Sequence, residues 1–245
     1  MGIHKRMRDI IHKAEKDPLG AMMLDYLNGR HDAFVEVEST TLEMWTMPGE
    51  TMFRSFSEMD EVERSALQLC DGKILDVGAG AGCHSLYLQQ NNMDVDALDI
   101  SPGCIEVMAQ RQVKNVIHQN LFSLTEGKYS TVLMLMNGLG ICGTLDGCNL
   151  FLQFIKTILD GGGQVIAEST DLGSLYEDPG ASHYSSDRYY GETEFIMKYR
   201  SLTSDSFSWL YVDFKTLETL AVFNGLRCEQ LVADSGGKYL ARIFR

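Results

Sequence analysis

Three glycines at alternate positions follow a short apolar segment, and this feature constrains the fold more than any other. The apolar segment runs from Lys73 to Val77, and the glycines are Gly78, Gly80 and Gly82. Glycine adopts backbone conformations that other residues avoid, and it leaves the backbone open to a ligand. Residues 83–90 have helical character, so their free amide groups are expected to face the same turn. The pattern predicts a buried strand, a tight turn and a helix, with a ligand at the turn.

The chain beyond this motif supports an α/β fold. From residue 73 onward, short apolar runs alternate with helical stretches, which is typical of a parallel sheet covered by helices on both faces. After the first strand, the expected strands are 94–98, 116–118, 131–136, 165–167, 227–232 and 239–244. The expected helices are 83–90, one that begins after Ser101, 144–159 and 214–223, and the run from Asp160 to Gly163 is expected to end the third of them.

Residues 1–70 lack this alternation. Helices are expected near 10–27 and 59–69, with an irregular stretch around 45–49. We expect this segment to pack on the core as a helical and irregular cap. The main domain would then cover residues 71–245.

A second departure from the alternation follows the fifth strand. Residues 193–199 and 207–212 are rich in β-forming side chains, and they flank the turn-like residues 203–205. This pattern predicts an antiparallel β-hairpin, inserted near 193–212.

Composition limits the partners and the compartment. With 245 residues, the chain has the length of one large domain, and its formal net charge of −13 disfavours nucleic acid as a partner. The six cysteines have no metal-binding spacing, which predicts free thiols in a reducing compartment and no bound metal. No apolar run approaches membrane-spanning length. We expect a cytoplasmic monomer or homodimer without a membrane partner.

Two acidic residues indicate which ligand occupies the glycine turn. Asp99 ends the second strand, where a carboxylate can accept the hydroxyls of a ribose. Asp76 lies two residues before the first glycine, where it would disfavour a pyrophosphate and favour a ligand with an ammonium and a sulfonium group. A dinucleotide motif would also need a small third residue at the position of Cys83. The residues favour S-adenosylmethionine, with a nicotinamide-dependent oxidoreductase as an alternative.

Together these motifs resemble the class I S-adenosylmethionine-dependent methyltransferases of the small-molecule type, over about residues 72–168 and more loosely to the C-terminus. The resemblance implies a Rossmann-like three-layer sandwich with a seven-stranded, mostly parallel sheet in the order 3-2-1-4-5-7-6. It implies S-adenosyl-L-methionine as cofactor, S-adenosyl-L-homocysteine as product, no metal, and in-line methyl transfer to O, N or C of a small-molecule acceptor. A noncatalytic S-adenosylmethionine-binding regulatory module stays open as an alternative.

The resemblance also implies a set of cofactor-binding residues. They are Asp76, Gly78, Ala79, Gly80 and Gly82 around the methionine part, Asp99 at the ribose, Ile100, Asn120 and Leu121 at the adenine, and Met136 and Asn137 facing the methyl group. The family more often has Asp at the position of Asn120. Arg54, in the preceding cap, could bind the cofactor's carboxylate as a bidentate fork, or it could be an ordinary surface arginine.

The acceptor side is expected in the polar loop 171–192 and in the hairpin. His183 is the candidate base, and Tyr184, Tyr189 and Trp209 are candidate acceptor contacts. Alternating aromatic residues in the hairpin could equally form its buried face. Asn137 begins a motif found in amino-methyltransferases, but the Pro-Pro-aromatic continuation is missing. The Asp cluster of magnesium-dependent catechol-type enzymes, a basic RNA-binding appendage and a reactive Cys pair are also missing. The acceptor is therefore expected to be a small molecule or a side chain.

Overall fold

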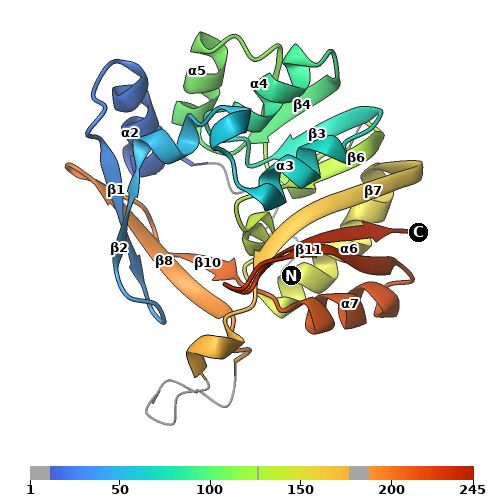
Figure 1. The fold of residues 1–245 in the computed structure, drawn as a ribbon. Helices are drawn as coiled ribbons and strands as arrows, with labels where there is room; N and C mark the ends of the chain where they lie inside the picture. Colours follow the sequence, from blue (N-terminus) through green and yellow to red (C-terminus); the bar gives the residue numbers. More distant parts are fainter. Residues whose placement is uncertain (1–11, 126, 177–187) are drawn as a thin grey trace.

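The computed structural model describes residues 12–125, 127–176 and 188–245, and its main sheet has seven strands in these ranges (Figure 1). The strands are β3 (Lys73–Val77), β4 (Asp94–Asp99), β5 (Asn115–His118), β6 (Tyr129–Met134), β7 (Leu159–Thr170), β11 (Arg227–Ala233) and β12 (Lys238–Phe244). Across the sheet the order is β5-β4-β3-β6-β7-β12-β11, with β12 antiparallel to both of its neighbours and the other pairs parallel. Numbered along the chain, this is the predicted order 3-2-1-4-5-7-6.

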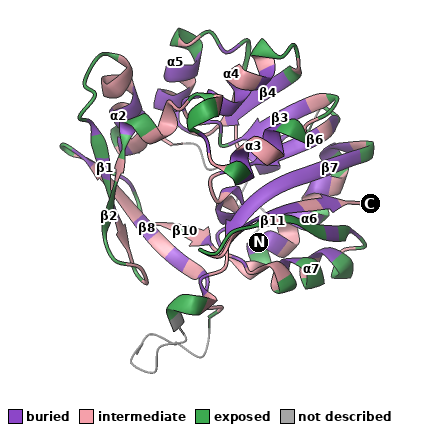
Figure 2. Ribbon diagram, viewed as in Figure 1, coloured by how far each residue is buried: buried purple, intermediate pink, exposed green. Residues whose placement is uncertain are grey.

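Helices cover both faces of the main sheet, which explains why its strands are apolar at consecutive positions. The helices are α3 (Glu61–Gln68), α4 (Cys83–Gln90), α5 (Pro102–Gln110), α6 (Leu145–Ile158) and α7 (Phe214–Phe223). Leu75 and Val132 pack in one core cluster with residues of α6 and α7, and their neighbours Ile74 and Leu133 pack in another with residues of α3 and α4. Figure 2 shows the resulting buried sheet between partly exposed helices. The predicted α/β sandwich is confirmed.

A second, antiparallel sheet lies beside the first (Figure 1). Its strands are β1 (Phe34–Ser39), β2 (Trp45–Pro48), β8 (Glu192–Tyr199), β9 (Leu202–Thr203) and β10 (Phe207–Leu210), in the order β10-β8-β1-β2 with β9 on β8. The pairing of β8 with β10 confirms the predicted hairpin. Helix α2 (Pro18–Leu27) packs between this sheet and α5.

The prediction of a helical and irregular cap is wrong for β1 and β2. Val35 and Val37 are buried and alternate with Glu36 and Glu38, which is the period of a strand with one covered face. The stretch expected to be irregular contains β2, which pairs with β1. The far partner of β1 is β8, more than 150 residues later, so local sequence does not indicate the pairing. The domain division at residue 70 stays a prediction.

Two further boundaries differ from the predictions. Among the described residues, the helix predicted near 10–27 begins at Pro18, because proline occupies the first turn and Asp17 caps it by accepting from Gly20 N. Helix α6 ends at Ile158, just before the run from Asp160 to Gly163 that was predicted to end it. The run itself lies inside β7, beside a register shift between Tyr129 and Thr131 on β6, so the fifth strand begins earlier than the predicted residue 165. The short 3-10 helices are η1 (Ala14–Lys16), η2 (Gly49–Met52), η3 (Phe56–Glu58), η4 (Leu121–Ser123), η5 (Gly138–Cys142) and η6 (Gly173–Tyr176). Over the described part of the chain, no helix is long and apolar enough to span a bilayer.

Candidate active site

The glycine turn lies where the strand order reverses. Strand β3 pairs with β4 on one side and with β6 on the other, and ligands of open α/β sheets bind at the carboxyl ends of such strands. Gly78, Gly80 and Gly82 have φ values of 71°, 57° and 77°. A Cβ at Gly82 would also lie only 2.8 Å from Cγ2 of Val113. The turn is therefore built for glycine, both in backbone conformation and in space, and Ala79 between the first two glycines is buried.

Asp99 ties the end of β4 to this turn. Its Oδ2 accepts from Gly80 N at 2.9 Å, and its Oδ1 accepts from Ser101 N at the same distance. Burial raises the pKa of Asp99, while the two amides act in the opposite direction. Each carboxylate oxygen can accept a further hydrogen bond. Asp99 thus retains the capacity to bind the hydroxyls of a ribose.

Asp76 lies inside β3 and is 2% exposed. Its Oδ2 accepts from the Ser85 hydroxyl at 2.6 Å, which connects β3 to α4. Burial raises the pKa of Asp76, and the charge of His84 lowers it. The carboxylate that we expect to favour a cationic ligand is therefore already hydrogen-bonded to a hydroxyl of the protein.

Arg54 does not have the free guanidinium that the sequence-based prediction requires. Its Nη1 and Nη2 donate to the two carboxylate oxygens of Glu63 at 2.6 and 2.7 Å, and its Nε donates to the Thr51 carbonyl. Glu63 Oε1 is also 2.9 Å from His84 Nε2. Arg54 is therefore not an ordinary surface residue, because both terminal nitrogens of its guanidinium bind a buried carboxylate of this chain. Its contact with the cofactor stays a prediction. Glu63 was not predicted from the sequence.

The predicted adenine side is formed by the ends of β4 and β5. The carbonyl of Ile100 accepts from His12 N at 3.0 Å and from His118 Nε2 at 3.2 Å. Asn120 begins η4, where its Oδ1 accepts from Phe122 N, and Leu121 is buried.

Residues of the cap also lie over the glycine turn. Measured from the position of a Cβ on Gly80, Met23 Cε and Met52 Sδ are 3.7 and 3.8 Å away. Met23 is fully buried and Met52 partly buried, and both pack in a hydrophobic cluster with residues of α5 and β8. Sequence reasoning did not identify these residues, because methionine at helical spacing is typical of any core.

Met136 and Asn137 follow β6 in an uncommon conformation. Both have φ of 55°, in the left-handed region that residues with a Cβ rarely adopt. Glu168 Oε2 accepts from Met136 N and Oε1 accepts from Asn137 N, each at 3.1 Å. Thr170 donates its hydroxyl to Asn137 Oδ1 at 2.7 Å. A single acidic residue in the buried stretch 165–169 of β7 was a signal for Glu168 that the sequence analysis did not use.

The candidate acceptor residues have different surroundings. Trp209 in β10 packs on η5, since a Cβ at Gly140 would lie 2.0 Å from Trp209 Cε2. Tyr189 donates its hydroxyl to Asp213 Oδ2 at 2.6 Å and accepts from Asp213 N at 2.9 Å. Burial raises the pKa of Tyr189. His183 and Tyr184 lie outside the described residues.

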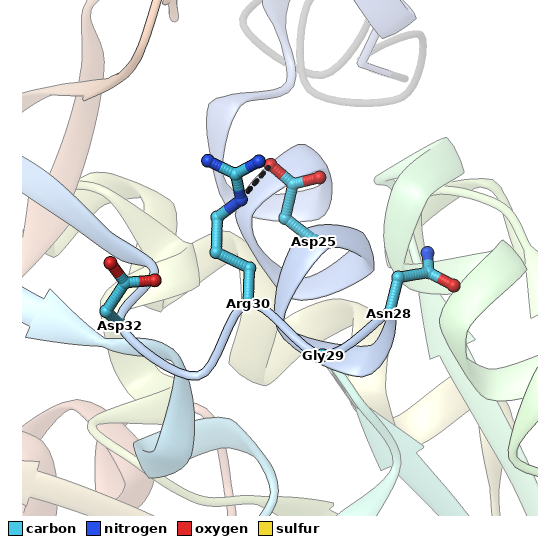
Figure 3. Close-up of a pocket in the computed structure, with 5 residues that line it drawn as sticks. All are labelled: Asp25, Asn28, Gly29, Arg30 and Asp32. Carbon is cyan, nitrogen blue, oxygen red and sulfur yellow. Dashed lines mark ion pairs between the residues drawn. The ribbon is translucent and has the colours of Figure 1, made fainter.

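A polar pocket of about 520 Å³ is lined by none of the residues of the glycine turn, and Figure 3 shows the residues that do line it. It is lined by Asp25, Asn28, Gly29, Arg30 and Asp32, at the end of α2 and in the turn that follows. Arg30 Nε lies 3.8 Å from Asp25 Oδ2, so its charge is already paired. None of the predicted site residues lines this pocket.

The donor set at the glycine turn fits a nucleoside with a cationic substituent. Within residues 12–125, 127–176 and 188–245, no three His, Cys, Asp or Glu side chains gather as metal ligands would. By contrast, the turn at Gly80 can admit a ligand to the backbone, and Asp99 can accept hydroxyl groups beside it. These features fit S-adenosylmethionine.

Comparison with known proteins supports this interpretation. Residues 51–134 match the family model described as tellurite resistance protein TehB. The crystal structure of an S-adenosylmethionine-dependent methyltransferase from Bacteroides fragilis, in complex with S-adenosyl-L-homocysteine, is 40% identical and has a TM-score of 0.90, covering 97% of this chain and 98% of that chain. A search of the curated proteins found no match.

Two more distant structures share the fold alone. The CcbJ methyltransferase from Streptomyces caelestis is 13% identical with a TM-score of 0.62, covering 94% of this chain and 98% of that chain. CalS10 from Micromonospora echinaspora, described as an amino pentose methyltransferase, is 14% identical with a TM-score of 0.51, covering 80% and 95%. The 40% identical methyltransferase shows the family of this chain, and the glycine turn, Asp99 and the strand order agree with it. This chain belongs to the class I S-adenosylmethionine-dependent methyltransferases.

Proposed function

We propose that this protein transfers a methyl group from S-adenosylmethionine to a small-molecule acceptor by in-line displacement. The observation that carries the proposal is the glycine turn at the switch point of the sheet, hydrogen-bonded to Asp99 through Gly80 N. The related Bacteroides fragilis protein, crystallised with S-adenosyl-L-homocysteine, supports the cofactor. CalS10 acts on an amino pentose, which supports a small-molecule acceptor for this fold.

In this proposal the protein binds the cofactor and the acceptor and aligns them for the transfer, and its own residues form no covalent bonds. When bound, S-adenosylmethionine supplies a methyl group on a good leaving group. Asp99 accepts the ribose hydroxyls, and the turn at Gly80 brings backbone amides to the ligand. Asp76 favours the cationic portion, and Met136 and Asn137 border the methyl group from the end of β6. Alignment of two reactants in a closed site contributes most of the acceleration in such a reaction.

Calorimetric titration tests the cofactor. We expect S-adenosylmethionine and S-adenosylhomocysteine to bind and NAD not to bind. Binding of NAD without either sulfur compound would instead support an oxidoreductase. Release of S-adenosylhomocysteine from a metabolite pool then separates an enzyme from a noncatalytic binding module.

Asp99→Ala tests the proposed ribose site. Loss of these hydrogen bonds should weaken S-adenosylhomocysteine binding by about 1–3 kcal/mol, or roughly 5- to 150-fold in Kd. Asp94→Ala is the matched control, because Asp94 begins the same strand and is exposed. Equal affinity of both variants and the unchanged protein would show that the ribose binds elsewhere.

We also propose that the protein acts in the cytoplasm, as a monomer or homodimer. All six cysteines fall in the described ranges and are free thiols, five of them buried, which supports a reducing compartment. Cell fractionation and light scattering during size-exclusion chromatography test these two statements.

A further inference from the structure

The end of β6 is held in one conformation by a buried carboxylate. Two consecutive left-handed residues with side chains cost of order 1–2 kcal/mol each. Glu168 offsets this cost by accepting from both backbone amides, and it is fully buried. Lys238 Nζ lies 3.7 Å from Glu168 Oε1 and also donates to Asp60, which anchors the carboxylate in turn. The backbone of Met136 and Asn137 is therefore preorganised.

The side chain of Asn137 is oriented as well. Thr170 donates to Oδ1, so the carboxamide oxygen is engaged within the protein. Thr170 is itself the last residue of β7, the strand next to β6. No hydrogen-bond acceptor for Asn137 Nδ2 is found among the described residues. Two amide N–H groups on a half-buried, fixed side chain are thus available to a ligand.

These N–H groups belong to the same edge of the sheet as the glycine turn. Asn137 immediately precedes η5, and a Cβ at Gly78 would lie 3.2 Å from Ile141 Cδ1 of that turn. Strands β3 and β6 are parallel neighbours, so their carboxyl ends meet at one edge. Trp209 of the hairpin packs on Gly140 of the same 3-10 helix. The short helix that begins after Asn137 therefore contacts both the glycine turn and the hairpin.

We infer that Asn137 is a specificity-determining residue, whose amide N–H groups, oriented by Thr170 and Glu168, bind a deprotonated oxygen of the methyl acceptor. This inference rests on the proposed function and names its substrate class: a small molecule that is methylated on a carboxylate or similar oxyanion. An anionic oxygen has several lone pairs, so it can accept from Asn137 and still attack. An amine nitrogen has one lone pair, and accepting a hydrogen bond would consume the pair needed for attack.

Atoms, electrons and charge balance in this methyl transfer without a catalytic base. The acceptor oxygen forms the new O–CH3 bond with one of its lone pairs, while the S–CH3 bond breaks and its electron pair stays on sulfur. The oxyanion and the sulfonium cation become a neutral methyl ester or ether and a neutral thioether. No proton moves, so this chemistry needs no residue of the general-base type.

The test uses acetate and methylammonium as probes on the whole protein saturated with S-adenosylhomocysteine. In 15N–1H correlation spectra, acetate should shift the Asn137 side-chain amide protons downfield in a saturable manner, and methylammonium should not. Saturation-transfer spectra then report acetate binding in the variants. Asn137→Asp replaces the donor with an acceptor and should abolish the saturable signal. Asn92→Asp, an exposed change of equal charge, should not affect it.

Thr170 supplies a second, independent arm. Thr170→Val removes the hydroxyl that orients the amide and should weaken acetate binding about five-fold or more, while Thr170→Ser restores the hydroxyl and should restore binding. A purely structural role for Thr170 would lower the free energy of unfolding in the valine variant without this selective loss and rescue.

The possible failures are distinguishable. If S-adenosylhomocysteine does not bind in calorimetry, the proposed function fails. If it binds but acetate leaves the Asn137 amide unchanged, or if methylammonium shifts it, the inference about the acceptor is overturned while the proposed function stands.

Discussion

Glu63→Gln should destabilise the protein more than its position in the cap suggests. Glu63 is 1% exposed, and its two oxygens accept from Arg54 twice and lie beside His84. Glutamine keeps one acceptor and turns an NH2 group toward these donors. Arg54 would then lie largely in the interior without its counter-charge, and His84 would retain only the charge of Asp76.

The magnitude follows from the burial of the partners. Removal of one member of a buried ion pair costs about 3–5 kcal/mol, because the remaining charge stays desolvated. The Arg54 side chain is 20% exposed, and His84 can lose its proton, so both partners relieve part of the cost. We expect a loss of about 3 kcal/mol in the free energy of unfolding near neutral pH.

The pH dependence gives a sharper test of the same network. Burial opposes the ionisation of Glu63, yet His84 and Arg54 lower its pKa below the ordinary value of 4.5, so its contribution is lost as pH falls through the folded-state pKa. Burial alone would lower the pKa of His84, but Cys83, Glu63 and Asp76 raise it well above 6.5. The contribution of His84 is complete below 6.5 and is lost as pH rises through its folded-state pKa. The unfolding free energies of the unchanged protein and of Glu63→Gln should therefore differ most at pH values between the folded-state pKa of Glu63 and that of His84.

Urea unfolding followed by tryptophan fluorescence, at several pH values from 4 to 10, measures the effect. Asp205→Asn is the control, because Asp205 pairs with Lys16 at 3.0 Å but its side chain is 81% exposed. Such exposed pairs contribute at most about 1 kcal/mol. A loss below about 1 kcal/mol for Glu63→Gln, without dependence on pH, would refute the reasoning.

Two other sites give independent predictions of stability. Asp17 caps α2 by accepting from Gly20 N, and it also accepts from Gly103 N in the first turn of α5, each at 3.0 Å. Asp17→Ala should therefore lower the unfolding free energy by about 2–3 kcal/mol in urea, and a loss near zero would contradict the double role. Gly103→Ala would place a Cβ 2.6 Å from the Gly20 Cα and should cost about 1–3 kcal/mol in thermal unfolding, whereas Gly161→Ala meets nothing within 4 Å and should be close to neutral.

Local patterns in the sequence predicted the main sheet and the glycine turn well. The strand at 73–77 and the helices at 83–90 and 214–223 have the predicted bounds, because burial on both faces leaves apolar runs and because capping residues terminate helices locally. The family resemblance correctly implied the strand order. Asp99 was recognisable because an acidic residue at the end of a buried strand stands out in any sequence.

Tertiary structure decided the contacts between distant segments. Strand β1 pairs with β8. The guanidinium of Arg54 donates to the carboxylate of Glu63, and the hydroxyl of Thr170 donates to the side chain of Asn137. For each of these contacts the sequence contains several strands or polar side chains that could have been the partner. Hydrogen bonds and ion pairs are short-ranged, so only the packing of the two sheets and α2 determined which groups came within reach of one another.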